Sequence, residues 1–200
     1  MDFRFKEGEL EFDRELSDLD KQVFDFVSVL EKAGIRYVVI SGYVAILLGR
    51  SRSTEDVDLF IEKTGFEKFK ELANELQKKN YWILNTSDVR EAFGYLKGNL
   101  ALRFAKKGEV IPNFEVKFPK KEMDSVSLED PLPVRIGRSR IMMSRLEVQI
   151  PFKLWLGSEK DIEDAVYIYE LFKEVLDRKR MGDIAGKLKV EKRMIKYGIL

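Results

Sequence analysis

The chain has 200 residues, of which 44% are apolar and 36% are charged, so it is long enough and apolar enough to fold around its own core. Its 36 Lys and Arg residues nearly balance its 35 Asp and Glu residues, which argues against attraction of the whole molecule to nucleic acid or membrane. It has no Cys and no His, which excludes disulfides, thiolate nucleophiles, Cys-type zinc sites and histidine bases. Carboxylates therefore remain as the groups for acid–base chemistry and for binding a metal such as Mg²⁺.

The N-terminal half predicts alternating helices and strands. Residues 1–16 alternate charge with Phe and Leu, which suits an edge strand or a docked arm. Ser17 with Asp20 is a capping-box pattern that begins an amphipathic helix ending at Gly34. The elements expected next are a buried strand over 37–40, a short helix over 44–48, a strand over 57–62, a helix from Thr64 and Glu67 to residue 80, and a strand over 81–84.

The C-terminal half is less regular. Residues 85–99 predict loops or a short helix, and 119–133 predict a linker. Strand-like pairs predict two hairpins, one from 100–105 and 114–118 and one from 134–136 and 141–143. After Pro151 the composition becomes helical, with Ser158 and Asp161 capping a long helix and Asp183 capping a last basic helix. We therefore expect a core over residues 1–150 and a C-terminal helical region over 151–200 packed on it.

Asp56 and Asp58 are the main candidates for chemistry. Two residues apart on a predicted strand, they leave from one face with Cα atoms about 6.5–7 Å apart, and they repel each other unless a cation bridges them. Mg²⁺ is bound by one or two carboxylates together with substrate phosphates, so the pair predicts a magnesium–triphosphate site. The competing interpretation is a polar strand end that faces solvent.

Small and basic residues precede this pair. Ser41-Gly42 lies between a buried strand and a short helix, where backbone N–H groups can approach phosphate, although an ordinary turn has the same pattern. Arg50 and Arg52 lie on the loop before Asp56 and can contact phosphate oxygens, or can form a solvated basic loop. We interpret all four residues as nucleotide-binding.

Glu115 and Lys153 are candidates further along the chain. If the strand of Glu115 neighbours that of Asp58, Glu115 becomes a third carboxylate, serving as metal ligand and as base toward an incoming hydroxyl, rather than a partner of Lys117. Lys153 precedes a helix whose acids can orient it toward a triphosphate, whereas helix capping accounts for those acids without any function.

Taken in order, these residues resemble the polymerase-β-type nucleotidyltransferase superfamily. The resemblance is carried by the buried strand, the Ser41-Gly42 turn, the short helix and the run Gly49-Arg50-x-Arg52-x-Thr54-x-Asp56-x-Asp58. Residues 152–164 resemble the helical segment of small prokaryotic members, some of which serve in toxin–antitoxin systems. Two positions depart from the family pattern, because the turn is Ser-Gly instead of Gly-Gly or Gly-Ser and the third acid is Glu instead of Asp.

The resemblance implies an α/β (α+β) fold with a mixed sheet flanked by helices and followed by a C-terminal helical region. It implies a transferase that uses Mg²⁺ or Mn²⁺ to move an NMP group from an NTP such as ATP to an acceptor hydroxyl on a protein, a nucleic acid or a small molecule. The expected metal-binding and catalytic residues are Asp56, Asp58 and Glu115, and the expected nucleotide-binding residues are Ser41, Gly42, Arg50, Arg52 and Lys153.

The alternative is a catalytically degenerate module that binds nucleotide or RNA and regulates a partner, as in a toxin–antitoxin pair. Its support is a basic run near the C-terminus, although a solvated helix face has the same composition: Arg178, Lys179, Arg180, Lys187, Lys189, Lys192, Arg193 and Lys196. We expect a cytoplasmic protein without a membrane contact, because no signal-peptide pattern and no apolar run of roughly 20 residues occurs. The sequence does not identify the acceptor, the NTP or the oligomeric state.

Overall fold

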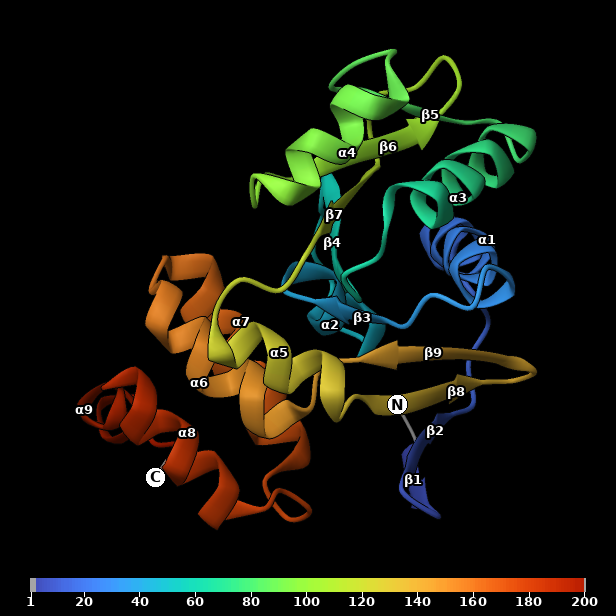
Figure 1. The fold of residues 1–200 in the computed structure, drawn as a ribbon. Coiled ribbons are helices and arrows are strands. Elements are labelled where there is room, and N and C mark those ends of the chain that lie inside the picture. The colour runs from blue at the N-terminus through green and yellow to red at the C-terminus, as the bar shows by residue number, and fades with distance from the viewer. Residues whose placement is uncertain (1–2, 200) are drawn as a thin grey trace.

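A mixed β-sheet runs through the computed structural model, which describes residues 3–199 (Figure 1). In this part of the chain the sheet has nine strands in the order β1-β2-β8-β9-β3-β4-β7-β6-β5. The strands are β1 Phe3–Lys6, β2 Glu9–Phe12, β3 Tyr37–Ile40, β4 Asp56–Ile61, β5 Tyr81–Ile83, β6 Leu102–Lys106, β7 Asn113–Lys117, β8 Leu132–Ile136 and β9 Ser139–Met143. In the centre, β3 and β4 are antiparallel, whereas β4 and β7 are parallel.

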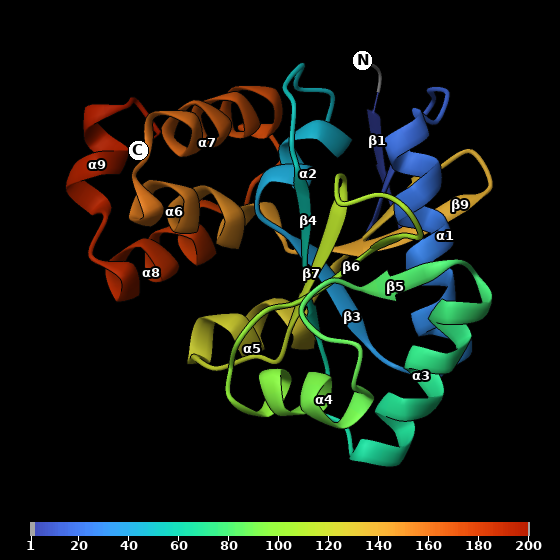
Figure 2. The same ribbon diagram turned by 90° about the horizontal axis from the view of Figure 1, so that it is seen from above.

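Helices lie on both sides of the sheet (Figures 1 and 2). They are α1 Asp18–Lys32, α2 Gly42–Leu47, α3 Phe66–Lys78, α4 Val89–Lys97, α5 Glu122–Glu129, α6 Leu146–Leu156, α7 Glu159–Phe172, α8 Arg178–Leu188 and α9 Glu191–Lys196. The last four helices gather on one side of the sheet, and the Tyr167 hydroxyl of α7 donates to the Leu48 carbonyl oxygen at 3.1 Å, beside the end of α2. None of the helices in residues 3–199 is long and apolar enough to cross a membrane.

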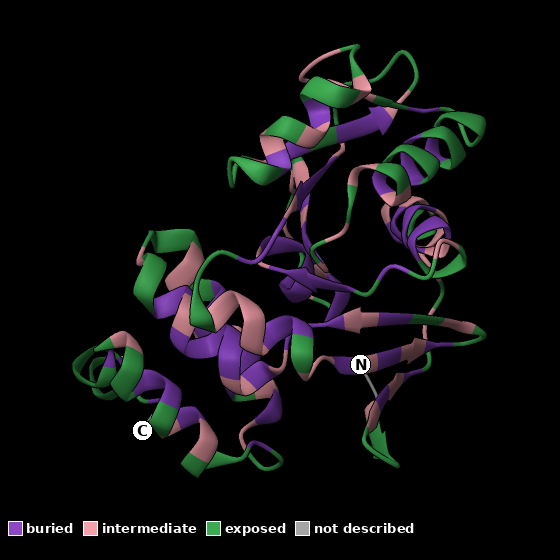
Figure 3. Ribbon diagram, in the orientation of Figure 1, coloured by how far each residue is buried: buried purple, intermediate pink, exposed green. Residues whose placement is uncertain are grey.

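The alternation along β4 separates the core from the candidate site. Val57, Leu59 and Ile61 are fully buried in the main apolar core, while Asp56, Asp58 and Phe60 leave on the opposite face. Phe60 joins Val38, Ile40 and Leu128 in a second apolar cluster, so α5 covers that part of the face. Asp56 and Asp58 lie on that face and are only partly buried. Figure 3 shows buried residues along the central strands and exposed residues on the outer faces of α3 and α4.

The structure confirms the mixed sheet with flanking helices, both predicted hairpins and the caps at Ser17 and Ser158. Two predicted caps are wrong. Gly65, not Thr64, is the N-cap of α3, and the Thr64 hydroxyl donates to the Gly65 carbonyl instead. Asp183 lies inside α8, whose N-cap is Asp177.

Three regions that the sequence left open acquire definite structure. The N-terminal residues form the β1–β2 hairpin at a sheet edge, residues 85–99 contain α4, and the predicted linker contains α5. Helix α6 begins at Leu146 and includes Pro151, so it spans the position at which we expect the C-terminal helical region to begin. The segment predicted as a linker thus packs, through Leu128 of α5, on the same sheet face that carries Asp58.

Candidate active site

The Ser41-Gly42 turn lies directly beside the aspartates. Ile40, the last residue of β3, pairs with Asp58 of β4, so the chain turns into α2 one residue beyond that pair. Ser41 has φ 65° and ψ −133°, a backbone conformation that glycine adopts readily and that costs other residues about 1–3 kcal/mol. The chain therefore holds a strained residue next to the carboxylates.

The pairing of β4 with β7 brings the third carboxylate to the same place. Asp58 is opposite Glu115, and Asp56 is opposite Asn113. Neighbouring strands lie about 4.8 Å apart, so Asp58 and Glu115 stand side by side on one face. Arg103 of β6 is opposite Glu115 in turn, which extends the row of charged side chains by one strand.

Two cations hold Glu115. The Lys117 Nζ lies 2.9 Å from Glu115 Oε2 and 2.7 Å from Asp58 Oδ1, and Arg103 Nη2 lies 2.6 Å from Glu115 Oε1. Burial is the largest influence on Glu115 and raises its pKa, but hydrogen bonds and charges from Lys117 and Arg103 outweigh burial and lower the pKa. For Lys117, burial is the largest influence and lowers the pKa, but charges and hydrogen bonds from Asp58 and Glu115 outweigh burial and raise the pKa.

Asp56 carries negative charge with little compensation. Its pKa is raised, first by burial and then by repulsion from Asp58 and Glu115, while Lys117 and a hydrogen bond from Thr54 oppose the shift. In residues 3–199 no group of three or more acidic side chains is arranged to hold a metal ion, and Glu115 is occupied by its two cations. The Asp56 and Asp58 oxygens are nevertheless hard donors on one face of β4, and the raised pKa of Asp56 reflects the repulsion between neighbouring carboxylates there, which fits Mg²⁺ or Mn²⁺.

The predicted nucleotide-binding cations form a separate, buried cluster around Asp164 of α7. The Asp164 carboxylate is 0% exposed and binds Arg50 and Arg52, and it also accepts a hydrogen bond from Lys153 Nζ at 2.8 Å. Lys153 is itself only 1% exposed and pairs with Asp161 at 2.8 Å as well. Arg50 reaches Glu163 in addition. The cluster joins the loop before β4 to α6 and α7, so its first effect is to fix that loop.

Arg52 connects this cluster to the turn. A Cβ atom added to Gly42 would lie 3.0 Å from Arg52 Nη2, so the guanidinium group rests against Gly42. Asp164 keeps it there by an ion pair. Of the four basic or small positions expected to bind nucleotide near the turn, Ser41, Gly42 and Arg52 are thus brought together, whereas Arg50 points toward α7.

Two residues of this site were not proposed from the sequence, namely Arg103 as a neighbour of Glu115 and Lys117 as a bridge to Asp58. The sequence indicates Lys117 only as a partner that would leave Glu115 without a function. Its alternation with Glu115 on one strand was the available signal, since side chains two residues apart share a face. The position of Arg103 depends on the β6–β7 register, which the irregular connection between those strands concealed.

Comparison with known proteins places this geometry in context. The sequence profile of a family described as "Nucleotidyl transferase of unknown function (DUF2204)" matches residues 20–199. No curated protein matches the chain.

Solved structures of low sequence identity share the fold. An antigenic nucleotidyltransferase-like protein from Paracoccidioides brasiliensis is 17% identical, with 88% of this chain and 90% of that chain covered and a TM-score of 0.52. The antibiotic-resistance factor ANT(2″)-Ia in solution is 12% identical, with 91% and 98% covered and a TM-score of 0.56. A crystal structure of ANT(2″)-Ia in complex with adenylyl-2″-tobramycin is also 12% identical, with 86% and 97% covered and a TM-score of 0.56.

Proposed function

Because the chain belongs to this nucleotidyltransferase family, we propose that it is a Mg²⁺-dependent enzyme that transfers an NMP group from an NTP to an acceptor hydroxyl. The observation that carries the proposal is the placement of Asp56 and Asp58 beside the Ser41-Gly42 turn through the Ile40–Asp58 pair. A pair of hard carboxylates next to small residues and the first turn of a helix suits a divalent cation together with a triphosphate.

Each residue has a proposed role. Asp56 and Asp58 would hold Mg²⁺, which when bound would offset the charge of the triphosphate. The Ser41-Gly42 backbone and the Arg52 guanidinium would contact phosphate oxygens, because Arg52 already rests against Gly42. Arg50 and Lys153 would support nucleotide binding together with Arg52, because all three cations pair with Asp164 and hold the loop before β4 in place.

Glu115 would complete the reaction. The acceptor oxygen forms a bond to the α-phosphorus while the bond to pyrophosphate breaks, and Glu115 takes the hydroxyl proton. The lowered pKa of Glu115 makes it a weak base as long as Lys117 and Arg103 surround it. Arg103 and Lys117 each engage one oxygen of Glu115, so movement of at least one of these cations would free an oxygen to accept the proton.

The test is transfer of label from α-labelled NTPs, with Mg²⁺, into the protein, nucleic-acid and small-molecule fractions of a cell extract. Asp58→Ala should abolish incorporation, and chelation of Mg²⁺ should do the same. Glu62→Gln is the matched control, because Glu62 follows the same strand but pairs with Arg36 and Lys68 outside the site. Incorporation that survives Asp58→Ala would rule out the proposed mechanism.

A second candidate function rests on the cations around Glu115. If Lys117 and Arg103 never leave, the chain would bind nucleotide or RNA without turnover. The basic C-terminal run supports RNA binding only in part, since Arg180 is paired with Asp130 and Lys187 with Glu122. Salt-sensitive RNA binding without any label transfer would favour this second function over the first.

A further inference from the structure

Lys117 occupies the position at which a metal ion would meet Asp58 and Glu115. It leaves β7 two residues after Glu115, on the same face of the sheet, and its ammonium group bridges the two carboxylates at 2.7 and 2.9 Å. The next strand carries Arg103 against the other oxygen of Glu115. The carboxylates on this face are thus already neutralised in part by cations that belong to the chain.

We propose that Lys117 is a displaceable counter-ion that makes the binding of metal and of NTP cooperative. This inference rests on the proposed function, because it assumes that Asp58 is a metal ligand. A divalent cation that arrives alone must compete with a tethered ammonium group for Asp58. A cation that arrives with a triphosphate brings phosphate oxygens with which the displaced Lys117 can pair, so each ligand should strengthen binding of the other.

The geometry allows Lys117 to move, whereas the buried Asp164 cluster allows no comparable movement. The Lys117 side chain is 31% exposed, and an ammonium group on a flexible four-carbon stem can exchange partners. Lys153, the other lysine bound to two carboxylates near the site, is 1% exposed and sits between α6 and α7. Lys117 is therefore suited to exchange between carboxylate and phosphate partners, and Lys153 is suited to a fixed position.

Arg103 explains why Lys117 can move while Glu115 stays in place. Arg103 remains on Glu115 when Lys117 leaves, so the carboxylate does not become an isolated charge. Asp58 loses in the same step the one cation with which it pairs in residues 3–199, and it becomes free to bind the metal. The displacement thus opens Asp58 first.

The experiment is a Mn²⁺ titration, followed by the loss of the free-ion EPR signal, with and without a nonhydrolysable ATP analogue. Because the analogue itself binds Mn²⁺, Mn²⁺ bound by the protein is obtained by comparison with a matched titration of the analogue without protein. Wild-type protein should bind Mn²⁺ at least about 5-fold more tightly when the analogue is present. Lys117→Met should bind Mn²⁺ alone about 5-fold or more tightly than wild type and should show a smaller effect of the analogue. Lys117→Arg, which keeps the charge, should resemble wild type.

Lys106→Met is the matched control. Lys106 is similarly exposed, at 27%, and lies on the adjacent strand, but it pairs with Asp25 on the other face of the sheet. Its Mn²⁺ affinity should equal that of wild type. Equal Mn²⁺ affinity in Lys117→Met and wild type would overturn the inference, and so would independence of Mn²⁺ and analogue binding in wild type, a result that needs no variant.

The outcome separates this inference from the proposed function. Tighter Mn²⁺ binding by Lys117→Met in a protein that transfers no label would support the counter-ion and reject turnover. Label transfer by the wild-type protein, together with equal Mn²⁺ affinity in Lys117→Met and wild type, would support turnover and reject the role of Lys117 as a counter-ion.

Discussion

Asp164 and Asp58 adjoin the same turn but have opposite surroundings. Asp164 is fully buried and holds three cations, one of which rests against Gly42. Among residues 3–199, Asp58, whose side chain is 16% exposed, forms an ion pair with Lys117 alone, and its neighbour Asp56 forms none. We call Asp164 with Arg50, Arg52 and Lys153 the closed cluster, and it fixes the shape of the site. We call Asp56, Asp58 and Glu115 with Lys117 the open cluster, and it leaves a position for an external cation. The carboxylates that we propose as metal ligands are those whose charge the chain leaves incompletely compensated.

Breaking the closed cluster should have the largest effect on stability. Asp164→Asn leaves Arg50, Arg52 and Lys153 without their shared carboxylate and should lower the free energy of unfolding by about 3–5 kcal/mol. Denaturant unfolding measures this loss. Glu163→Gln is the control, because Glu163 also pairs with Arg50 but is 56% exposed and should change stability by less than about 1 kcal/mol. A similar loss in both variants would contradict the distinction.

Filling the open cluster should have the next largest effect. Mg²⁺ with a nonhydrolysable NTP, at about 100 times its Kd, should raise the unfolding free energy by about 2.7 kcal/mol, and EDTA should remove this gain. Asp56→Asn should lose most of the ligand-induced gain while the ligand-free protein stays as stable as wild type or becomes more stable, since repulsion from Asp58 disappears. Thermal unfolding with and without ligand tests both statements. A full ligand-induced shift in Asp56→Asn would place the metal elsewhere.

A second closed cluster sharpens the comparison through pH. Asp20 of α1 is 1% exposed and accepts hydrogen bonds from Arg14, Ser17 and Tyr43. Burial is the largest influence and raises its pKa, but those hydrogen bonds together lower it below the ordinary value of 3.8.

Because the folded pKa is depressed, Asp20 stabilises the fold above the unfolded pKa, and this contribution is lost as pH falls through the folded pKa. Asp20→Asn should cost about 2 kcal/mol at pH 7, and its difference from wild type should shrink below pH 4. Denaturant unfolding of both proteins across this pH range is the measurement. A difference that stays constant with pH would show that the charge of Asp20 is irrelevant.

The smallest predicted effect is at the turn between the two clusters. Ser41→Gly removes a side chain from a backbone conformation that favours glycine and should raise the unfolding free energy by about 1 kcal/mol. Urea unfolding measures this gain, and Ser53→Gly on the neighbouring loop serves as the control for loss of a serine. A decrease in stability would mean that the Ser41 side chain makes a contact worth more than the strain.

The strands and helices with a clear apolar period were predictable because one face of each is buried. The β3-turn-α2-β4 order and the long helices follow from that period alone. The sequence indicates only loops or a short helix for the α4 segment and a linker for the α5 segment. Both helices are short and carry few buried residues, so tertiary contacts decide them. The Thr64 and Asp183 caps failed because Gly65 and Asp177 lie closer to the true helix starts.

The site was predictable up to the point at which strand order matters. Asp56 and Asp58 share a face by spacing alone, but the position of Glu115 beside Asp58 depends on a parallel pair of strands 57 residues apart. The Asp164 cluster joins residues 114 positions apart, which no local pattern reveals. The capping pattern of Ser158 and Asp161 predicts the start of α7 correctly. It does not predict that Asp164, three residues further along, is fully buried.

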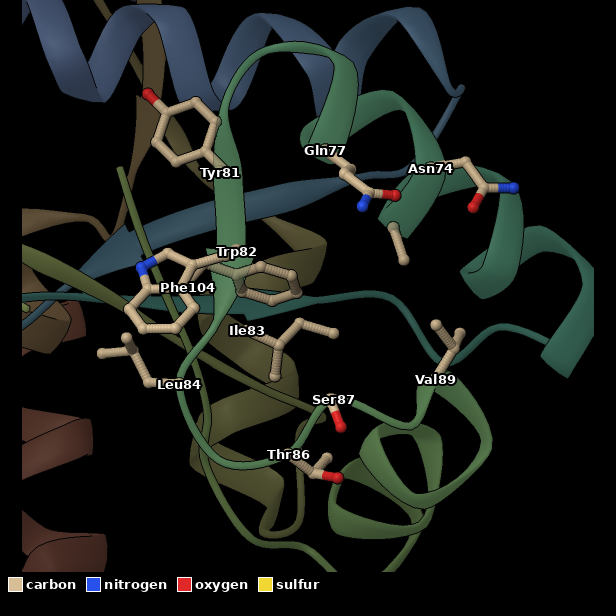
Figure 4. Close-up of a pocket in the computed structure, with 11 residues that line it drawn as sticks. Asn74, Gln77, Tyr81, Trp82, Ile83, Leu84, Thr86, Ser87, Val89 and Phe104 are labelled. Atoms are coloured by element: carbon tan, nitrogen blue, oxygen red, sulfur yellow. The ribbon is translucent and has the colours of Figure 1, made fainter. Parts of the chain in front are cut away.

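The pocket at the sheet edge shows why a cavity alone does not mark the site. A cavity of about 370 Å³ lies beside β5, where Figure 4 shows Ile83, Val89 and Gln77 around it. Its lining contains no acidic or basic side chain. The carboxylates of the proposed site lie on β4 and β7, in the middle of the sheet, so the chemistry is found from charge and register rather than from volume.

The most direct measurement is a crystal structure with Mn²⁺ and a nonhydrolysable NTP, using the anomalous signal of manganese. The ion should appear between Asp56 and Asp58, the triphosphate should lie against the Ser41-Gly42 turn, and the Asp164 cluster should be unchanged. Manganese bound away from both aspartates, with nucleotide on another surface, would contradict the assignment of the open cluster as the active site.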